Sequence, residues 1–260
     1  MSIKFTILGS GTSTGVPQIG CTCPVCTSTD PRDHRMRCSS FIETDNTRIL
    51  LDCGPDFYHQ ALRYMPYKAL SGVLISHEHF DHVGGIDDLR AYCHFGDVDI
   101  YANASSANSL QTRMPYCFVE ERYPGIPLIN LHSILPYHPF TIGDIEVLPI
   151  EVIHGKLPIL GYVLTIGAVR IGYITDMKTM DERNYALLEH LDLLVMNALR
   201  IEKHWTHQTL DEALVVAKEV HAKQTVFVHM SHDMGCHEGI DAQLPPSVSL
   251  GYDGLTIEYP

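Results

Sequence analysis

The chain has 260 residues, 45% of them hydrophobic, and a formal net charge of −13. This length suits one large α/β domain or two small ones, and we expect a single domain over residues 1–260. The acidic balance argues against sequence-independent nucleic-acid binding as the main activity, because such binding needs dense Lys and Arg. No stretch approaches the ~20 apolar residues of a membrane-spanning helix, so we expect no membrane partner.

Apolar runs rich in β-branched residues recur along the chain and predict strands. They cover residues 3–8, 48–51, 72–76, 145–150, 161–166, 169–175, 193–196 and 225–229. Helical patterns lie between some of these runs, at 56–63, 181–190 and 209–220. In the last helix, Thr209 and Glu212 have the spacing of a capping box. Successive strands followed by strands alternating with helices predict a layered α/β sandwich.

Residues 1–9 run directly into the first predicted strand and lack the basic region, long apolar stretch and cleavage site of a secretion signal. The chain also has eight cysteines and sixteen histidines. Without a secretion signal, eight cysteines indicate metal sites and buried thiols instead of a disulfide framework. We therefore expect a cytoplasmic enzyme.

The segment after the apolar run 72–76 is dense in metal ligands. His77, His79, Asp81 and His82 fall within six residues. His77 and His79 lie two residues apart, so in an extended loop their side chains point the same way and can share one metal. Asp81 and His82 can turn toward a second metal. A surface loop does not need this much ligand chemistry, so we expect a metal site here.

Three further candidate ligands follow other predicted strands: His154, Asp176 and His229. Because open sheets place ligand sites at the carboxyl ends of strands, we expect these residues to converge on one edge. His154 would complete the first metal site, Asp176 would bridge both metals, and His229 would complete the second, with His232 as its competitor. Two divalent metals about 3.5–4 Å apart can activate a water and clamp phosphate oxygens. Mixed His and carboxylate ligands accept Mn²⁺ or Zn²⁺.

A second cluster of candidate ligands lies in a Cys-rich loop at about residues 20–38. Cys21, Cys23 and Cys26 form C-x-C-x-x-C, and three thiols at this spacing suit a tetrahedral structural Zn²⁺ that takes its fourth ligand from elsewhere. The alternative is three buried cysteines in a turn. Pro24 and the surrounding Thr and Gly residues are typical of a loop that would not be buried without a metal.

The pattern H-x-H-x-D-H at the end of a strand resembles the signature of the metallo-β-lactamase superfamily of hydrolases. The resemblance extends over nearly the whole chain, from Leu8-Gly9-Ser10-Gly11-Thr12-Ser13 through Leu50-Leu51-Asp52-Cys53-Gly54 to His229. It implies a four-layer αββα sandwich and a metal-dependent hydrolase with a di-metal centre.

The C-x-C-x-x-C motif shortly after G-S-G-T-S-T-G-V-P resembles the PhnP-type branch, whose members are phosphodiesterases acting on cyclic phosphates of ribose. This resemblance implies that His232 is the fourth zinc ligand and that His207 is catalytic, with His204 as a nearby competitor. It also implies a small phosphodiester substrate, such as a cyclic ribose phosphate. The branch is often dimeric, so a homodimer is one expectation, although the sequence does not determine the oligomeric state.

The expected reaction is metal-assisted phosphodiester hydrolysis. Asp81 would hold a catalytic metal, and His207 would protonate the leaving alkoxide from the side opposite the metal ligands. The substrate, the active-site metals and the roles of five cysteines stay open. These cysteines are Cys38, Cys53, Cys93, Cys117 and Cys236, of which Cys53 and Cys93 are most simply buried.

Two other functions compete with this interpretation. A tRNA 3′-end processing endonuclease of the same superfamily shares the Gly11-Thr12-Ser13 loop, but the acidic charge and the lack of a basic insertion oppose it. A non-catalytic metal-binding scaffold or sensor belongs to another class, and the complete ligand set opposes it. A thioester hydrolase or a lactamase also stays open, because a fold does not determine a function.

Overall fold

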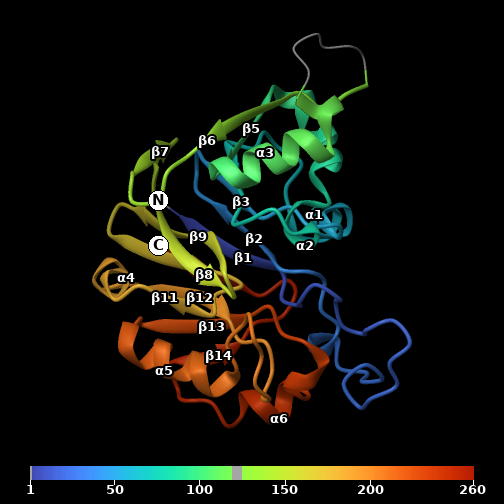
Figure 1. Cartoon of the computed structure of the whole chain (residues 1–260), viewed down its shortest axis with the longest axis vertical. Coiled ribbons are helices and arrows are strands. Elements are labelled where there is room, and N and C mark those ends of the chain that lie inside the picture. The colour runs from blue at the N-terminus through green and yellow to red at the C-terminus, as the bar shows by residue number, and fades with distance from the viewer. Residues whose placement is uncertain (1, 119–124) are drawn as a thin grey trace.

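The computed structural model describes residues 2–118 and 125–260, which form two facing β-sheets with helices on their outer faces (Figure 1). Within the described residues, the first sheet has seven strands. Their order across the sheet is β15 (Thr256–Tyr259), β1 (Ile3–Gly9), β2 (Ser39–Glu43), β3 (Arg48–Leu51), β4 (Gly72–Leu74), β5 (Val98–Ala102) and β6 (Ile129–Ser133). The pairs from β15 to β3 are antiparallel, and those from β3 to β6 are parallel.

The second sheet has eight strands among the described residues. Their order is β11 (Thr179–Met180), β8 (Ile145–His154), β9 (Leu157–Ile166), β10 (Val169–Ile174), β12 (Leu193–Asn197), β13 (Gln224–Val228) and β14 (Val248–Leu250), with β7 (Phe140–Ile142) also paired to β8. The strands from β10 to β14 are parallel. Each sheet therefore has a run of parallel strands whose carboxyl ends can place loops side by side.

The helices lie outside the two sheets or at their edges. The α-helices are α1 (Phe57–Tyr64), α2 (Phe80–Val83), α3 (Ala104–Arg113), α4 (Arg183–Leu187), α5 (Leu210–Val220) and α6 (His237–Asp241). The 3-10 helices are η1 (Pro31–Asp33), η2 (Ile86–Phe95), η3 (Pro115–Phe118) and η4 (His232–Met234). The predicted capping box of α5 is present, because Thr209 and Glu212 each bond the backbone N–H of the other. None of the helices in the described residues has the length and apolar character needed to cross a lipid bilayer.

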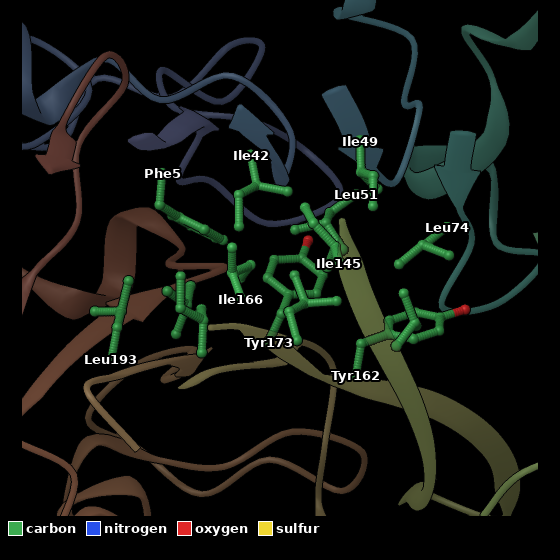
Figure 2. Close-up of a cluster of buried hydrophobic side chains, with 14 of the residues drawn as sticks. Phe5, Ile42, Ile49, Leu51, Leu74, Ile145, Tyr162, Ile166, Tyr173 and Leu193 are labelled. Carbon is green, nitrogen blue, oxygen red and sulfur yellow. The ribbon is translucent and has the colours of Figure 1, made fainter. Parts of the chain in front are cut away.

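Three layers of buried apolar side chains join these elements. Between the sheets, Phe5 and Leu74 of the first sheet face Tyr162 and Tyr173 of the second (Figure 2). A second cluster packs α5 against the outer face of the second sheet, and a third packs α1, η2 and α3 against the first. The order helix, sheet, sheet, helix is the predicted four-layer αββα sandwich, which is confirmed.

Every predicted strand and helix is found, although some bounds differ and other elements were not predicted. β8 continues to His154, so this candidate ligand ends a strand instead of following one. β2 and β15 were missed because they are short and half polar, and α3 was missed because its sequence is rich in Ser and Asn. The Asn103 side chain caps α3 by accepting from the Ser106 N–H, which favours a helix despite the weak apolar pattern.

Candidate metal centres

The ligand-rich segment is held by the turn that follows β3. The Cys53 N–H donates to the carbonyl oxygen of His82 at 2.8 Å, which fixes the end of α2. A Cβ atom at Gly54 would lie 2.1 Å from the carbonyl oxygen of Asp81. Only glycine allows the turn to approach α2 this closely. Asp81 and His82, which follow β4, are thus also held by the turn that follows the neighbouring strand β3.

Ligands from the second sheet converge on the same place. His154 ends β8, Asp176 follows β10, and His229 follows β13. Asp176 and His229 have φ angles of 58° and 60°, in the left-handed region that non-glycine residues seldom adopt. Such strain persists where the surrounding structure overrides it, and it is common at functional sites.

Asp176 lies between two groups of imidazoles. Its Oδ1 is 3.3 Å from His82 Nε2 and 3.2 Å from His229 Nε2. Its Oδ2 is 3.9 Å from His77 Nε2 and 3.1 Å from His207 Nε2. The position therefore suits the bridging role predicted for this carboxylate.

The potential ligand atoms form two compact groups, and within each group they all lie within 4.8 Å of one another. Atoms that bind one cation at about 2.0–2.2 Å lie about 3–4.4 Å apart, so both groups have the right size for a metal. The first group is His77, His79 and His154, and the second is Asp81, His82, Asp176 and His229. The structure thus brings together all seven residues predicted for the di-metal centre.

One buried nitrogen tests whether a cation fits this site. Nε2 of His82 has no hydrogen-bond partner in residues 2–118 and 125–260. It nevertheless faces carboxylate oxygens of Asp81 at 3.2 Å and Asp176 at 3.3 Å. A buried imidazole nitrogen directed at two carboxylates without hydrogen-bond geometry is what a shared metal ion would require.

Asp52 is a further residue of the candidate centre, for which the sequence analysis gave no role. It is fully buried after β3, and its Oδ2 accepts from His82 Nδ1 at 2.9 Å, from the Ser76 hydroxyl at 2.9 Å and from the Tyr173 hydroxyl at 3.2 Å. A metal-ligating histidine commonly donates its other ring N–H to a carboxylate in this way. The Thr206 carbonyl is the corresponding partner of His154, with 3.0 Å to Nδ1.

The charges of the cluster are unbalanced. Burial disfavours the imidazolium of His82, but the carboxylates of Asp176, Asp52 and Asp81 outweigh burial and raise the pKa of His82 well above its usual range. Burial likewise opposes the charged form of Asp176, but His229 and His82 hold its pKa well below the usual value. Three buried carboxylates around one imidazole are an excess of negative charge that divalent cations would neutralise.

His207 lies closer to the ligands than expected. Its ring is 4.6 Å from the ring of His154 and 4.9 Å from that of His229, and its Nε2 contacts Asp176 directly. It does not face the cluster across a cleft. Burial lowers the pKa of His207 to about 4, although Asp176 acts in the other direction. His154, Asp176 and His207 also form a compact group of potential ligands, so the expectation that His207 acts on the leaving group and holds no metal stays a prediction.

The second candidate centre joins the Cys-rich loop to the segment after β13. His232 Nδ1 lies 3.4 Å from Cys21 Sγ and 3.3 Å from Cys23 Sγ, and Cys26 completes a group within 4.8 Å. Sulfur ligands at about 2.3 Å from Zn²⁺ have this spacing. The backbone N–H of Cys26 and the His232 ring lower the pKa of Cys23 to about 6, which favours the thiolate that a metal binds.

Within residues 2–118 and 125–260, no two cysteines form a disulfide bond. Cys53 is fully buried, whereas Cys93 is only half-buried, because η2 lies at the surface. Cys38 is buried beneath the metal centre and accepts from the Thr175 hydroxyl at 3.6 Å.

Comparison with known proteins agrees with this architecture. Residues 47–230 match the model of the Beta-lactamase superfamily domain. The chain belongs to this superfamily. A crystal structure of a diphosphatase from the PhnP family superposes with a TM-score of 0.90 at 36% identity, covering 100% of this chain and 98% of that one. The chain therefore lies in the PhnP-type branch of this superfamily, as the sequence predicted.

Two curated relatives carry other names. An octanoyltransferase of Porphyromonas gingivalis is 43% identical over 255 residues, which are 97% of this chain and 51% of the relative. The chain thus spans about half the length of that relative. A ribonuclease Z of Acaryochloris marina is 31% identical over 118 residues, which are 44% of this chain and 36% of the relative.

Proposed function

We propose that this metallo-hydrolase cleaves a small phosphodiester at the centre formed around Asp176. The observation that carries the proposal is the position of this carboxylate, whose two oxygens face different groups of imidazoles at 3.1–3.9 Å. Two divalent cations bound there would polarise phosphate oxygens and lower the pKa of a water. Cyclic ribose phosphates are one substrate class that fits the proposal.

The protein supplies a fixed set of ligands for this reaction. Asp52 orients His82, and the Thr206 carbonyl orients His154, so each ring presents its Nε2 atom to the centre. Ligands fixed in this way need little reorganisation when charge develops on the phosphate, which is the main source of catalysis in such sites.

His207 is proposed to act on the leaving group. Its Nδ1 lies 2.9 Å from the Thr206 hydroxyl, which holds the ring, while its Nε2 points to Asp176 and the centre. Burial lowers the pKa of this imidazole to about 4, so it is neutral near pH 7 and must gain a proton before it can donate one to the leaving group. Loss of His207 should therefore slow the release of a poor alkoxide leaving group more than the release of one that departs without a proton.

A substrate and metal screen tests the proposal. The protein, purified without chelator, is assayed on bis(p-nitrophenyl) phosphate, on cyclic and linear phosphodiesters and on a panel of thioesters. We expect hydrolysis of diesters that EDTA removes and that added Mn²⁺ or Zn²⁺ restores. Activity on thioesters alone would contradict the proposal.

The similarity to ribonuclease Z supports tRNA 3′-end processing as a second candidate. It covers less than half of this chain, and the net charge of −13 opposes the binding of a polyanion. Binding of a tRNA precursor is measured at increasing salt concentrations. Tight, salt-dependent binding followed by cleavage at the 3′ end would favour this candidate over a small diester.

Acyl transfer is another candidate, because a relative about twice as long as this chain is named an octanoyltransferase. The hollow beside His204 is lined by Lys178, Lys203, His204, Trp205 and Glu212, and none of the described residues that line it is a Leu, Ile, Val or Met that would receive an octanoyl chain. The thioester panel, with an octanoyl thioester in it, decides this candidate in the same assay.

A further inference from the structure

The loop between β12 and α5 presents the only tryptophan of the chain to solvent. Trp205 is 92% exposed. A single exposed apolar side chain is common on protein surfaces and carries no meaning by itself. The construction of the loop and the neighbours of this ring therefore decide whether it has a function.

The loop is closed and braced. The Leu199 N–H donates to the Gln208 carbonyl at 2.9 Å, which joins its two ends. Inside the loop, Arg200 Nη2 donates to the Lys203 carbonyl at 2.9 Å. The backbone that carries Trp205 is thus held from both sides, and its ring is presented on a fixed support instead of a free segment.

A hollow of about 300 Å³ lies beside this ring. It is lined by Lys178, Lys203, His204, Trp205 and Glu212. The ammonium group of Lys178 is paired with Glu212 at 2.7 Å. Lys203 is exposed and makes no ion pair with any residue of the described ranges. The hollow thus offers one open aromatic face and one unpaired cation.

The hollow adjoins the metal centre. His204, which lines it, has its Nδ1 3.2 Å from Nδ1 of His207, and the other nitrogen of His207 contacts Asp176. Trp205 is two residues from His207, so their Cα atoms are at most about 7 Å apart. The side chains of His204 and His207 thus lie between this hollow and Asp176.

We propose that Trp205 and Lys203 form a subsite for the planar base of a nucleotide-type phosphodiester. Every nucleobase has a π-face that stacks on an aromatic side chain, and a lysine ammonium binds a phosphate oxygen as a point charge. The inference rests on the proposed phosphodiester hydrolysis and narrows its substrate class. It predicts that the protein prefers a nucleoside phosphate ester to a sugar phosphate without a base.

The single tryptophan makes binding directly measurable. The metal-loaded protein is titrated with AMP and, separately, with ribose 5-phosphate, while the fluorescence of Trp205 is recorded. We expect saturable quenching by AMP and none by ribose 5-phosphate, with weaker AMP binding in Lys203→Ala. Tyr58→Ala, which removes an exposed aromatic ring on α1, should leave the titration unchanged. No quenching by AMP, or equal effects of both ligands, would overturn the proposal.

Kinetics separate this subsite from the proposed function. For 2′,3′-cyclic AMP, Trp205→Ala should raise KM roughly 5- to 100-fold with little change in kcat, because stacking is the same in substrate and transition state. Trp205→Phe should keep most of the affinity, and a base-free cyclic ribose phosphate should show no effect. An equal change in KM for both substrates would overturn the subsite.

Two further outcomes separate a failure of the proposed function from a failure of the subsite. If the parent protein hydrolyses neither diester, the proposed function fails, while quenching by AMP still decides the subsite. If a tRNA acceptor-end oligonucleotide quenches Trp205 at concentrations where AMP does not, the occupant is an RNA end and the small-nucleotide proposal is overturned.

Discussion

The two candidate metal centres are built in opposite ways. The centre around Asp176 takes its ligands from strand ends and from α2, and all but one of its side chains are buried. The cysteine centre takes three ligands from one loop, and most of them are half-exposed. Around that loop, the buried apolar cluster among the described residues consists of Val16, Val25 and Cys26. The side chains of the first centre are positioned by the packed sheets, whereas the loop of the second centre has few buried apolar contacts of its own.

This difference predicts different consequences of losing a ligand. Where the sheets already fix the ligands, a substitution removes the cation and its chemistry but keeps the fold. Where a loop has few apolar contacts, the metal contributes folding free energy directly. The two centres share the segment that follows β13, which carries His229 and His232, and Met230 bonds the Ser10 and Thr12 backbone at 3.0 Å. Substitutions in either centre can therefore test whether the two centres differ in role.

The largest effect is expected from Asp81→Ala. This substitution should bring phosphodiester hydrolysis below detection, because it removes a carboxylate 3.2 Å from His82 Nε2 and leaves the second ligand group incomplete. Circular dichroism and thermal melting should match the parent. Asp87→Ala, which changes a half-exposed carboxylate on η2 that pairs with Arg90, is the matched control and should keep full activity. An unfolded Asp81→Ala protein would refute the view that the sheets alone fix this centre.

His207→Ala should have the next largest effect. General acid–base catalysis contributes ~10²–10⁴-fold, so turnover of a diester with a poor alkoxide leaving group should fall by about that factor. A p-nitrophenolate ester should be affected much less, because its leaving group departs without a proton. Metal content should stay unchanged. Equal losses on both substrates, or loss of a metal, would refute this role of His207, and His204→Ala then tests whether the neighbouring histidine has it.

Asp52→Asn should have a smaller effect on the same centre. Asp52 contacts His82 Nδ1 and not the metal position, and loss of such an outer partner typically costs ~10–100-fold in metal affinity or activity. Metal affinity is measured by competition with a chelator, together with kcat at saturating metal. Unchanged affinity and activity would mean that Ser76 and the backbone position His82 without this charge.

Cys23→Ser should have the smallest effect on chemistry and a clear effect on stability. The melting temperature should fall by roughly 5–15 °C, because the loop loses a ligand of its structural metal. kcat at a temperature where the variant is folded should stay within a few-fold of the parent. Thr27→Ser, in the same loop, is the control. Parent-like melting combined with loss of activity would reverse the assignment of the two centres.

The sequence predicted the residues that the structure brings together in both groups, and several of them occur in short patterns with fixed spacing. His77, His79, Asp81 and His82 follow one apolar run, and the thiols follow C-x-C-x-x-C. The candidates from distant parts of the chain were chosen by their places after predicted strands, and they meet because parallel strands align their carboxyl ends. The four-layer order followed from the same apolar runs and from the resemblance.

The sequence did not predict contacts between side chains that lie far apart along the chain. Asp52 lies thirty residues from His82, and only the pairing of β3 with β4 reveals that they meet. The direct contact of His207 with Asp176 depends on how the loop after β12 folds back, which no local pattern encodes. Trp205 gave no sequence signal, because its meaning arises from exposure beside a hollow.

Elemental analysis of the parent and two variants tests the central claim most directly. The parent, purified without chelator, should contain three metals per chain: two in the centre around Asp176, and one zinc held by the three cysteines and His232. Cys23→Ser should lose the zinc alone, and Asp81→Ala should keep it while losing metal from the other centre. A parent with at most one metal, or a Cys23→Ser protein that has lost all its metals, would contradict the existence of two centres with separate roles.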